Sequence, residues 1–269
     1  MSYLDSVNSP QDVKKLTTEE LEALAGEIRG AILNRDSKVG GHVGPNLGIV
    51  ETTIALHYVF DSPRDKIVYD VSHQSYPHKI LTGRKEGFTT DEGMSKISGY
   101  TNPDESEHDF FKVGHTSTSV SLACGLAKAR DLKGEKHNVI AVIGDGSLSG
   151  GEALEGLSNA AVLGSNIIVI VNDNKMSIAE NHGGLYTNLR LLRETEGRAE
   201  CNMFKALGFD YRYVGEGNSV SRMIDVLREV KDAAKPTLIH VRTLKGKGYK
   251  FAEENKEKWH WNVPFDIAS

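Results

Sequence analysis

The chain has 269 residues, with 32 Lys and Arg against 37 Asp and Glu, and two cysteines, Cys124 and Cys201. A chain of this length buries about 70% of its unfolded surface, so it needs no disulfide or metal to hold a core. The net charge of −5 excludes an overall attraction to nucleic acid or anionic lipid. Because no apolar run approaches the roughly 20 residues that cross a bilayer and no secretory signal is visible, we expect a cytoplasmic protein without a nucleic-acid or membrane partner. Cys124, in a run of small residues, is expected to be a buried thiol.

Apolar side chains recur at helical or strand spacing along most of the sequence. Thr17 and Glu20 form a capping box at the start of the first helical pattern. Two nearly continuous β-branched runs, at 138–143 and 166–171, are typical of strands covered on both faces. In chain order, the pattern predicts a helix at 17–34, a strand at 65–71, a helix at 116–133, a strand at 138–143, a helix at 151–163, a strand at 166–171, a helix capped by Asn218 that ends before Pro236, and a strand at 237–241.

Strands that alternate with helices indicate an α/β fold with a doubly wound, mainly parallel sheet and helices on both faces. No linker, repeat or low-complexity tract divides the chain, so residues 1–269 are expected to form a single domain. Two polar, weakly periodic segments, 85–109 and 175–200, interrupt the pattern. Segments of this length are either functional lids or disordered, and the sequence leaves both interpretations open.

Small and polar residues follow three of the predicted strands, where ligands bind in open α/β sheets. Ser72, His73 and Gln74 follow the strand at 65–71. Gly-Asp-Gly-Ser at 144–147 follows the next strand, and Asn-Asp-Asn-Lys-Met at 172–176 follows the third. Asp145 and Asn174 offer one carboxylate and one amide oxygen, a donor set that suits Mg²⁺ bound to a diphosphate. A tight turn is the alternative explanation for the Gly-Asp-Gly sequence.

The motif at 144–146, followed by Asn-Asp-Asn at 172–174, resembles the thiamine-diphosphate motif of transketolase-type enzymes. Further blocks resemble those of 1-deoxyxylulose-5-phosphate synthases, and together they cover essentially the whole chain. These blocks are 4–10, 41–48, 70–79, 113–119 and 172–178. The resemblance implies the thiamine-diphosphate-binding fold, with thiamine diphosphate and Mg²⁺ as cofactors. Pro45 and Ser72 depart from the small polar residue and the glycine expected at these positions, which leaves the donor substrate open.

The resemblance also implies roles for individual residues. Asp145, Asn174 and the carbonyl of Met176 would coordinate the metal. The implied cofactor-binding residues are His73, His115, Gly144, Asp145, Gly146, Ser147, Asn174, Met176 and Lys245, and the implied catalytic residues are His42, His73 and His260. His115 would lie at the start of the helix at 116–133, whose N-terminus favours an anion. A solvated charge remains an alternative for Lys245 and Lys247, and a packing role remains one for His260; the other histidines are read as scaffold or surface residues.

By resemblance, a glutamate on another domain activates the cofactor's aminopyrimidine. None of the carboxylates in this chain carries that motif, and Glu51, in an apolar helical segment, does not supply it. We therefore expect the N-terminal subunit of a split, transketolase-like enzyme that transfers a two-carbon ketol unit between sugar phosphates. A C-terminal subunit would complete it, with a homodimeric core in an α₂β₂ assembly. The alternatives are a synthase that condenses pyruvate with glyceraldehyde 3-phosphate, a non-catalytic thiamine-diphosphate-binding module, and a fragment of a longer enzyme.

Overall fold

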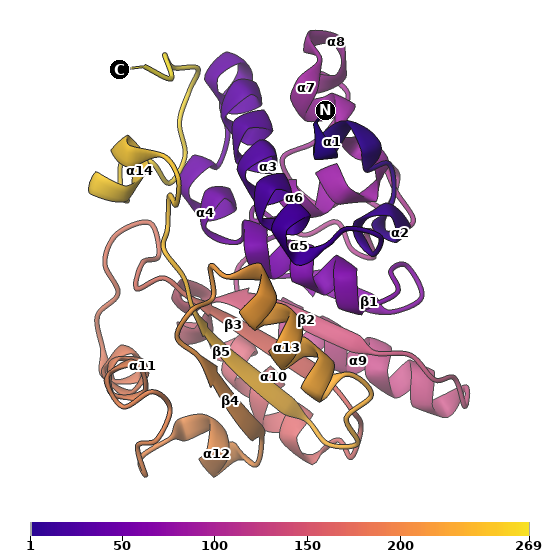
Figure 1. Ribbon diagram of the computed structural model, residues 1–269. Coiled ribbons are helices and arrows are strands. Elements are labelled where there is room, and N and C mark those ends of the chain that lie inside the picture. Colours follow the sequence, from indigo (N-terminus) through magenta and orange to yellow (C-terminus); the bar gives the residue numbers. More distant parts are fainter. Residues whose placement is uncertain (1, 269) are drawn as a thin grey trace.

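The computed structural model describes residues 2–268 and contains one five-stranded parallel sheet with the strand order β1-β2-β3-β5-β4 (Figure 1). The sheet confirms the predicted doubly wound α/β fold, and all four predicted strands are present. A further strand, β4, was not predicted. The strands are β1 (Lys66–Tyr69), β2 (Val139–Gly144), β3 (Ile168–Asp173), β4 (Asp210–Val214) and β5 (Thr237–Arg242).

Helices precede, connect and follow these strands. The α-helices are α1 (Tyr3–Ser6), α2 (Pro10–Val13), α3 (Thr18–Val39), α4 (Val43–Gly48), α5 (Val50–Val59), α6 (Tyr76–Lys79), α7 (Glu86–Thr89), α8 (Asp91–Met94), α9 (Ser119–Leu132), α10 (Gly151–Val162), α11 (Gly184–Glu194), α12 (Met203–Leu207), α13 (Val220–Val230) and α14 (Lys250–Glu254). A π-turn, η1 (Ile80–Arg84), follows α6, and a 3₁₀ turn, η2 (Asp145–Ser149), follows β2. Within residues 2–268, none of the helices is both long and apolar enough to cross a membrane.

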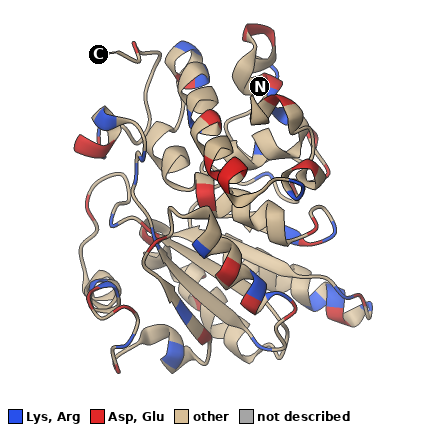
Figure 2. Ribbon diagram, viewed as in Figure 1, with Lys and Arg blue, Asp and Glu red and all other residues tan. Residues whose placement is uncertain are grey.

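The sheet separates two apolar cores, because alternate residues of each strand point to opposite faces. In β2, Ile140 and Val142 pack with the α3, α5 and α13 side chains on one face. Val139, Ala141 and Ile143 pack with α9, α10 and α12 on the other. The central strands are largely free of charge in Figure 2, whereas the charged residues lie mainly on the outer helices and loops. Cys124 is buried on α9, as expected.

The first helix shows how local signals set one end of an element and tertiary contacts set the other. The Thr17 side chain accepts a hydrogen bond from the Glu20 N–H, and Glu20 accepts one from the Thr17 N–H, which confirms the capping box. The helix runs five residues beyond the predicted end at Asn34, to Val39. Arg35 and Asp36 in this added turn are buried as an ion pair, so they do not mark a loop.

Two predicted helix starts are wrong. The helix predicted to start at residue 116 begins at Ser119, because Ser117 has a φ of 76°, which a right-handed helix cannot contain. The N–H groups of Ser117 and Ser119 instead donate to the Asp70 carboxylate, each at 2.9 Å. Asn218 does not cap α13 either, since the Ser219 side chain is the N-cap.

The two long polar segments are folded parts of the structure and include α7, α8 and α11. A buried ionic cluster anchors the first segment at Asp109. Arg84 donates to both oxygens of Asp109, at 2.7 and 2.9 Å, and His78 Nε2 lies 2.9 Å from Asp109 Oδ1. This largely buried ion cluster holds the segment in one position, which favours a fixed cover over a disordered loop.

Candidate functional site

The carboxyl edge of the sheet brings the three residues predicted to ligate the metal to one cavity. Gly144 at the end of β2 lies beside Asn172 near the end of β3, so the residues that follow these strands emerge at the same edge. Asp145 and Asn174 both line a cavity of about 220 Å³. The full lining comprises His42, Pro45, Val71, His73, Gln74, Thr116, Gly144, Asp145, Gly146, Ser147, Asn174, Met176, Ser177, Ile178, Lys245 and His260. Every predicted site residue except His115 is among them.

Asp145 is buried with one free oxygen. Its Oδ2 accepts a hydrogen bond of 2.8 Å from Asn181 Nδ2, and its Oδ1 is buried with no hydrogen-bond partner among the described residues. Burial, together with the nearby charge of Asp173, raises the pKa of Asp145 well above its usual range. The charge of Arg193 offsets this only in part, and Asp145 forms no ion pair among the described residues. A divalent cation would supply the missing positive charge.

Asp173, next to Asn174, is the opposite case. Burial works against its ionisation, but hydrogen bonds and charge from His240 and Arg193 lower the pKa of Asp173. His240 Nε2 lies 2.8 Å from Asp173 Oδ2, and Arg193 also pairs with this carboxylate. Asp173 is therefore a paired structural anion, whereas Asp145 has no ion-pair partner among the described residues.

The oxygens near Asp145 fit a small, hard cation. The side-chain oxygen of Asn174 accepts the Met176 N–H at 3.0 Å, and its second lone pair remains for another ligand. Within residues 2–268 no three His, Cys, Asp or Glu side chains form a metal-binding group. Asp145 and Asn174 thus supply one carboxylate and one amide oxygen, and Met176, whose carbonyl is the third predicted ligand, lines the same cavity. Mg²⁺ accepts such a set when a diphosphate and water complete its coordination.

Gly146 is required by close packing. A Cβ at this position would lie 2.9 Å from the Cα of Ser177, on the segment that crosses over the η2 turn. Ser147 follows at the cavity wall, and its carbonyl accepts a 2.8 Å hydrogen bond from Ser117 Oγ. A side chain at position 146 would collide with this segment, so the turn requires glycine there.

The three predicted histidines form one cluster. The His42 ring centroid lies 5.1 Å from that of His73 and 5.7 Å from that of His260, and the other pair is 5.6 Å apart. Burial lowers the pKa of His42 to about 4 and that of His260 to about 3, and it lowers the pKa of His73 well below its usual range. All three rings are therefore neutral near neutral pH, and each can donate and accept a hydrogen bond.

Asn46 links the backbone segments that carry two of these histidines, His42 and His73. This buried amide donates from Nδ2 to the carbonyls of His42 and His73, both at 2.7 Å. Its oxygen accepts the Tyr76 N–H at 2.9 Å. One side chain on α4 thus ties the start of its own helix to the segment after β1.

Lys245 and His260 face the cavity rather than taking the alternative roles considered for them. Lys245 is 1% exposed, donates to the Ser177 carbonyl at 2.8 Å and lies 3.1 Å from His260 Nδ1. Burial lowers the pKa of Lys245 to about 8. The packing role falls to Trp259, which is buried against Tyr249, with ring centroids 4.9 Å apart.

The structure does not bring His115 to the site. His115 is exposed, and its Nδ1 lies 2.7 Å from the Thr116 carbonyl. Its predicted place at a helix N-terminus is wrong because α9 begins at Ser119. The neighbouring Thr116 lines the cavity instead.

Sequence reasoning also missed the shape of the chain after β1. Val71 and Ser72 have φ angles of 57° and 67°, which are uncommon for residues other than glycine. The Ser72 hydroxyl donates to the Val113 carbonyl at 2.6 Å and accepts the Thr101 N–H at 3.0 Å. These bonds explain how a serine serves in place of the expected glycine. Gln74 also lines the cavity and accepts a 2.7 Å hydrogen bond from Asn172 Nδ2. Its position next to His73, after a predicted strand, was the sequence signal that could have identified it as a site residue.

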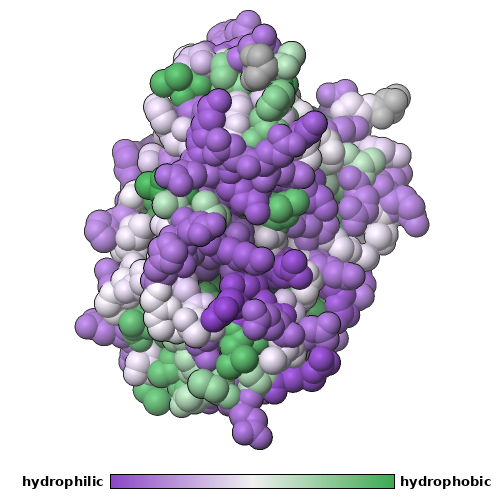
Figure 3. Space-filling view, turned by 90° about the vertical axis from the view of Figure 1, so that its left-hand side faces the viewer, coloured by the Kyte–Doolittle hydropathy of each residue, from purple (hydrophilic) through white to green (hydrophobic). Residues whose placement is uncertain are grey.

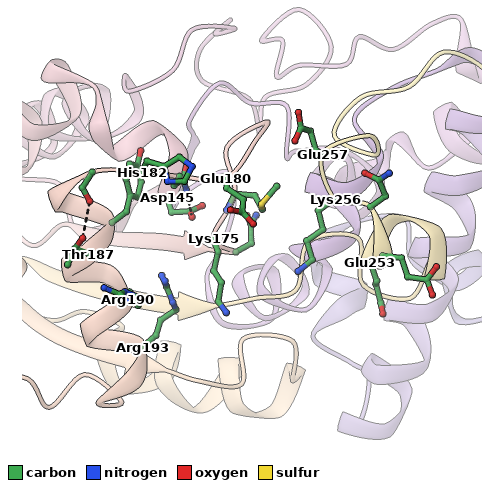
Figure 4. A pocket seen from close by; sticks show the side chains of 17 residues that line it. Asp145, Lys175, Glu180, His182, Thr187, Arg190, Arg193, Glu253, Lys256 and Glu257 are labelled. Atoms are coloured by element: carbon green, nitrogen blue, oxygen red, sulfur yellow. Dashed lines mark hydrogen bonds between the residues drawn. The ribbon is translucent and has the colours of Figure 1, made fainter.

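A larger cavity of about 700 Å³ adjoins the first and shares Asp145, Asn174 and Met176 with it. It lies between the segment after β3, α11 and the residues around α14. In Figure 4, Lys175 and Arg190 point into it from one side, and Glu253 lies on the other. The face that carries α11 and α14 is hydrophilic across its middle (Figure 3). We place the candidate site in the smaller cavity, because only that one also holds the histidines and Lys245.

Comparisons with known proteins show which family the sequence matches. A family model described as 1-deoxy-D-xylulose-5-phosphate synthase matches residues 4–201 and 190–243. The 1-deoxy-D-xylulose-5-phosphate synthase of Caldanaerobacter subterraneus is 46% identical, over 99% of this chain and 49% of the relative. That of Porphyromonas gingivalis is 45% identical, over 100% of this chain and 48% of the relative. The chain thus spans about half the length of the curated relatives it matches.

Solved structures show the same fold at lower identity. The transketolase of Campylobacter jejuni aligns with a TM-score of 0.73 at 22% identity, covering 93% of this chain and 41% of that one. The transketolase of Leishmania mexicana aligns with a TM-score of 0.69 at 22% identity, over 92% and 40% of the two chains. At this identity, the likeness to transketolases shows the fold alone.

Proposed function

Because the chain belongs to the 1-deoxy-D-xylulose-5-phosphate synthase family, a family of thiamine-diphosphate-dependent enzymes, we propose that it holds the cofactor's diphosphate through Mg²⁺. The observation that carries this proposal is the buried Oδ1 of Asp145, which has no hydrogen-bond partner among the described residues. This oxygen lies at a cavity that Asn174 and Lys245 also line. A divalent cation would ligate the free oxygens of Asp145 and Asn174, and the anion that it carries would lie near the Lys245 ammonium.

Each group of the cavity has a distinct part in the proposed site. Asp145, Asn174 and the Met176 carbonyl hold the metal, and the backbone at Gly146 with the Ser147 hydroxyl binds the diphosphate. The ammonium of Lys245 adds positive charge beside the anion. When bound, thiamine diphosphate supplies the carbon nucleophile of the reaction.

The neutral histidines serve the reacting end of the cavity in this proposal. His42, His73 and His260 can each donate a hydrogen bond to a substrate oxygen or accept a proton at the free ring nitrogen. Their low pKa values keep them uncharged, so they do not repel the cationic group of Lys245. Asn46 keeps the first two rings in place.

Two reactions are candidates. One is transfer of a two-carbon ketol unit between sugar phosphates, for which the transketolase-like fold is the support. The other is condensation of pyruvate with glyceraldehyde 3-phosphate, supported by relatives at 46% and 45% identity named for that product. We favour the second, because the structural likeness to transketolases rests on 22% identity. A binding module without activity is the remaining alternative.

We also propose that a second polypeptide or domain completes the site. Asp145 is the only carboxylate among the described residues that line the cavity, so a carboxylate that activates the cofactor's pyrimidine must come from elsewhere. Glu51 is engaged by Arg29 at 2.7 Å. A C-terminal transketolase-like partner, a homodimeric core within an α₂β₂ assembly and a cytoplasmic location remain predictions.

Titration calorimetry tests the proposal directly. The chain is titrated with thiamine diphosphate in the presence and absence of Mg²⁺. We expect Mg²⁺-dependent binding that Asp145→Asn weakens by more than about tenfold, because the substitution removes the charged ligand. Equal affinities for both chains would remove Asp145 from the site. Adding the candidate partner and assaying pyruvate against a ketose phosphate then separates the two reactions.

A further inference from the structure

A segment between β3 and α11 lies across the proposed metal site. This strap, residues 174–183, contains the hairpin-like bridge between Met176 and Glu180. The Ser177 carbonyl in the strap accepts a hydrogen bond from Lys245 Nζ at 2.8 Å. Just beyond the strap, the Tyr186 hydroxyl donates to the Gly146 carbonyl at 3.3 Å. The chain is thus fastened to Lys245 within the strap and to the Gly-Asp-Gly turn just beyond it.

The same strap contacts the proposed metal ligand itself. Asn181 Nδ2 donates to Asp145 Oδ2 at 2.8 Å, and Asp145 Oδ1 is left without a hydrogen-bond partner in the described chain. The two oxygens of this one carboxylate are therefore in different states. A hydrogen bond to one oxygen restricts rotation of the carboxylate, so the direction of the other oxygen is set before any ligand binds.

The Asn181 side chain makes no hydrogen bond within the described strap itself. The turn is closed by backbone groups, with the Ser177 N–H donating to the Ala179 carbonyl at 2.9 Å. In the described part of the chain, the bond to Asp145 is the one hydrogen bond of the Asn181 side chain. The Asn181 amide therefore contacts the Asp145 carboxylate and takes no part in closing the turn.

We propose that Asn181 is a positioning residue of the metal site, which orients the Asp145 carboxylate so that Oδ1 ligates the cation. This inference rests on the proposed function, because it requires that Asp145 binds a metal. It also makes metal affinity depend on the position of the strap. Residues that hydrogen-bond a metal ligand typically change metal affinity by about 10–100-fold when they are replaced.

Mn²⁺ binding, followed by electron paramagnetic resonance in the presence of thiamine diphosphate, tests this role without requiring catalysis. Asn181→Ala is expected to weaken Mn²⁺ binding by about tenfold. The matched control is Asn188→Ala. Asn188 lies on α11, and its side-chain amide donates a hydrogen bond of 2.8 Å to the Cys201 carbonyl. The control is expected to bind Mn²⁺ within about twofold of the parent, because it leaves Asp145 untouched.

A double-mutant cycle separates positioning from a general loss of structure. In an Asp145→Asn background, Asn181→Ala should cause no further weakening, since the amide acts only through that carboxylate. Unchanged affinity of Asn181→Ala would overturn the inference, as would tighter binding, which would mean that the amide competes with the ion. If Asp145→Asn itself leaves Mn²⁺ binding intact, the proposed function fails as well.

Discussion

Replacing Asn46 by alanine should loosen the histidine cluster and the fold together. The buried Asn46 side chain makes three hydrogen bonds, two to the carbonyls of His42 and His73 and one from the Tyr76 N–H. At about 1 kcal/mol for each bond, Asn46→Ala should lower the free energy of unfolding by about 3 kcal/mol. Urea denaturation measures this, provided that the slope with denaturant stays that of the parent.

Asn138 offers a matched control at the opposite end of the sheet. It is also buried and makes three side-chain hydrogen bonds, donating to Asp65 and Asp232 and accepting the Asp232 N–H. Asn138→Ala should therefore destabilise the chain by a similar amount, about 3 kcal/mol.

The two variants should differ in cofactor binding. Loss of the tether between His42 and His73 displaces a ring at the reacting end of the cavity, and one lost hydrogen bond of about 1.4 kcal/mol corresponds to about a tenfold change in affinity. Calorimetry with thiamine diphosphate and Mg²⁺ should show this loss for Asn46→Ala and parent-like binding for Asn138→Ala. Equal affinities for the two variants, or a stability loss below about 1 kcal/mol for Asn46→Ala, would refute the reasoning.

Two further predictions concern packing and pH. Gly146→Ala places a Cβ 2.9 Å from the Cα of Ser177, so it should lower the free energy of unfolding by about 1–3 kcal/mol in urea denaturation. It should also weaken thiamine diphosphate binding in calorimetry. A variant as stable as the parent would show that the strap moves to accommodate the methyl group. Burial lowers the pKa values of His57 and His78, so the folded chain binds fewer protons there than the unfolded chain does below about pH 6.5. The free energy of unfolding should therefore decrease as the pH is lowered from about 7 to about 5. An increase as the pH is lowered over this range would contradict the assignment of neutral buried rings.

Much of the fold could be predicted because its signals are local. The β-branched runs of β2 and β3 indicate buried strands whichever residues cover them. β4 was missed because it is an edge strand in which Asp210 and Arg212 are exposed, while Tyr211 and Val214 are buried on opposite faces of the sheet. Two charged residues in a five-residue strand hide the apolar pattern.

The site was predictable where a strand end carries the chemistry, as at Asp145 and Asn174. Asn46 and Asn181 were not, because each acts on a residue that the fold brings close. Asn181, for example, lies 36 positions from Asp145 in the sequence. No spacing rule connects such residues in a single sequence.

The parallel pairing of β2 with β3 also links metal binding to folding. Gly144 faces Asn172 in this ladder, so Asp145 and Asn174 meet only when both strands have paired around α10. The unfolded chain therefore offers no comparable site for the ion. Any free energy gained by loading cofactor adds to the stability of the entire sheet, and thermal denaturation should shift upward with ligand concentration.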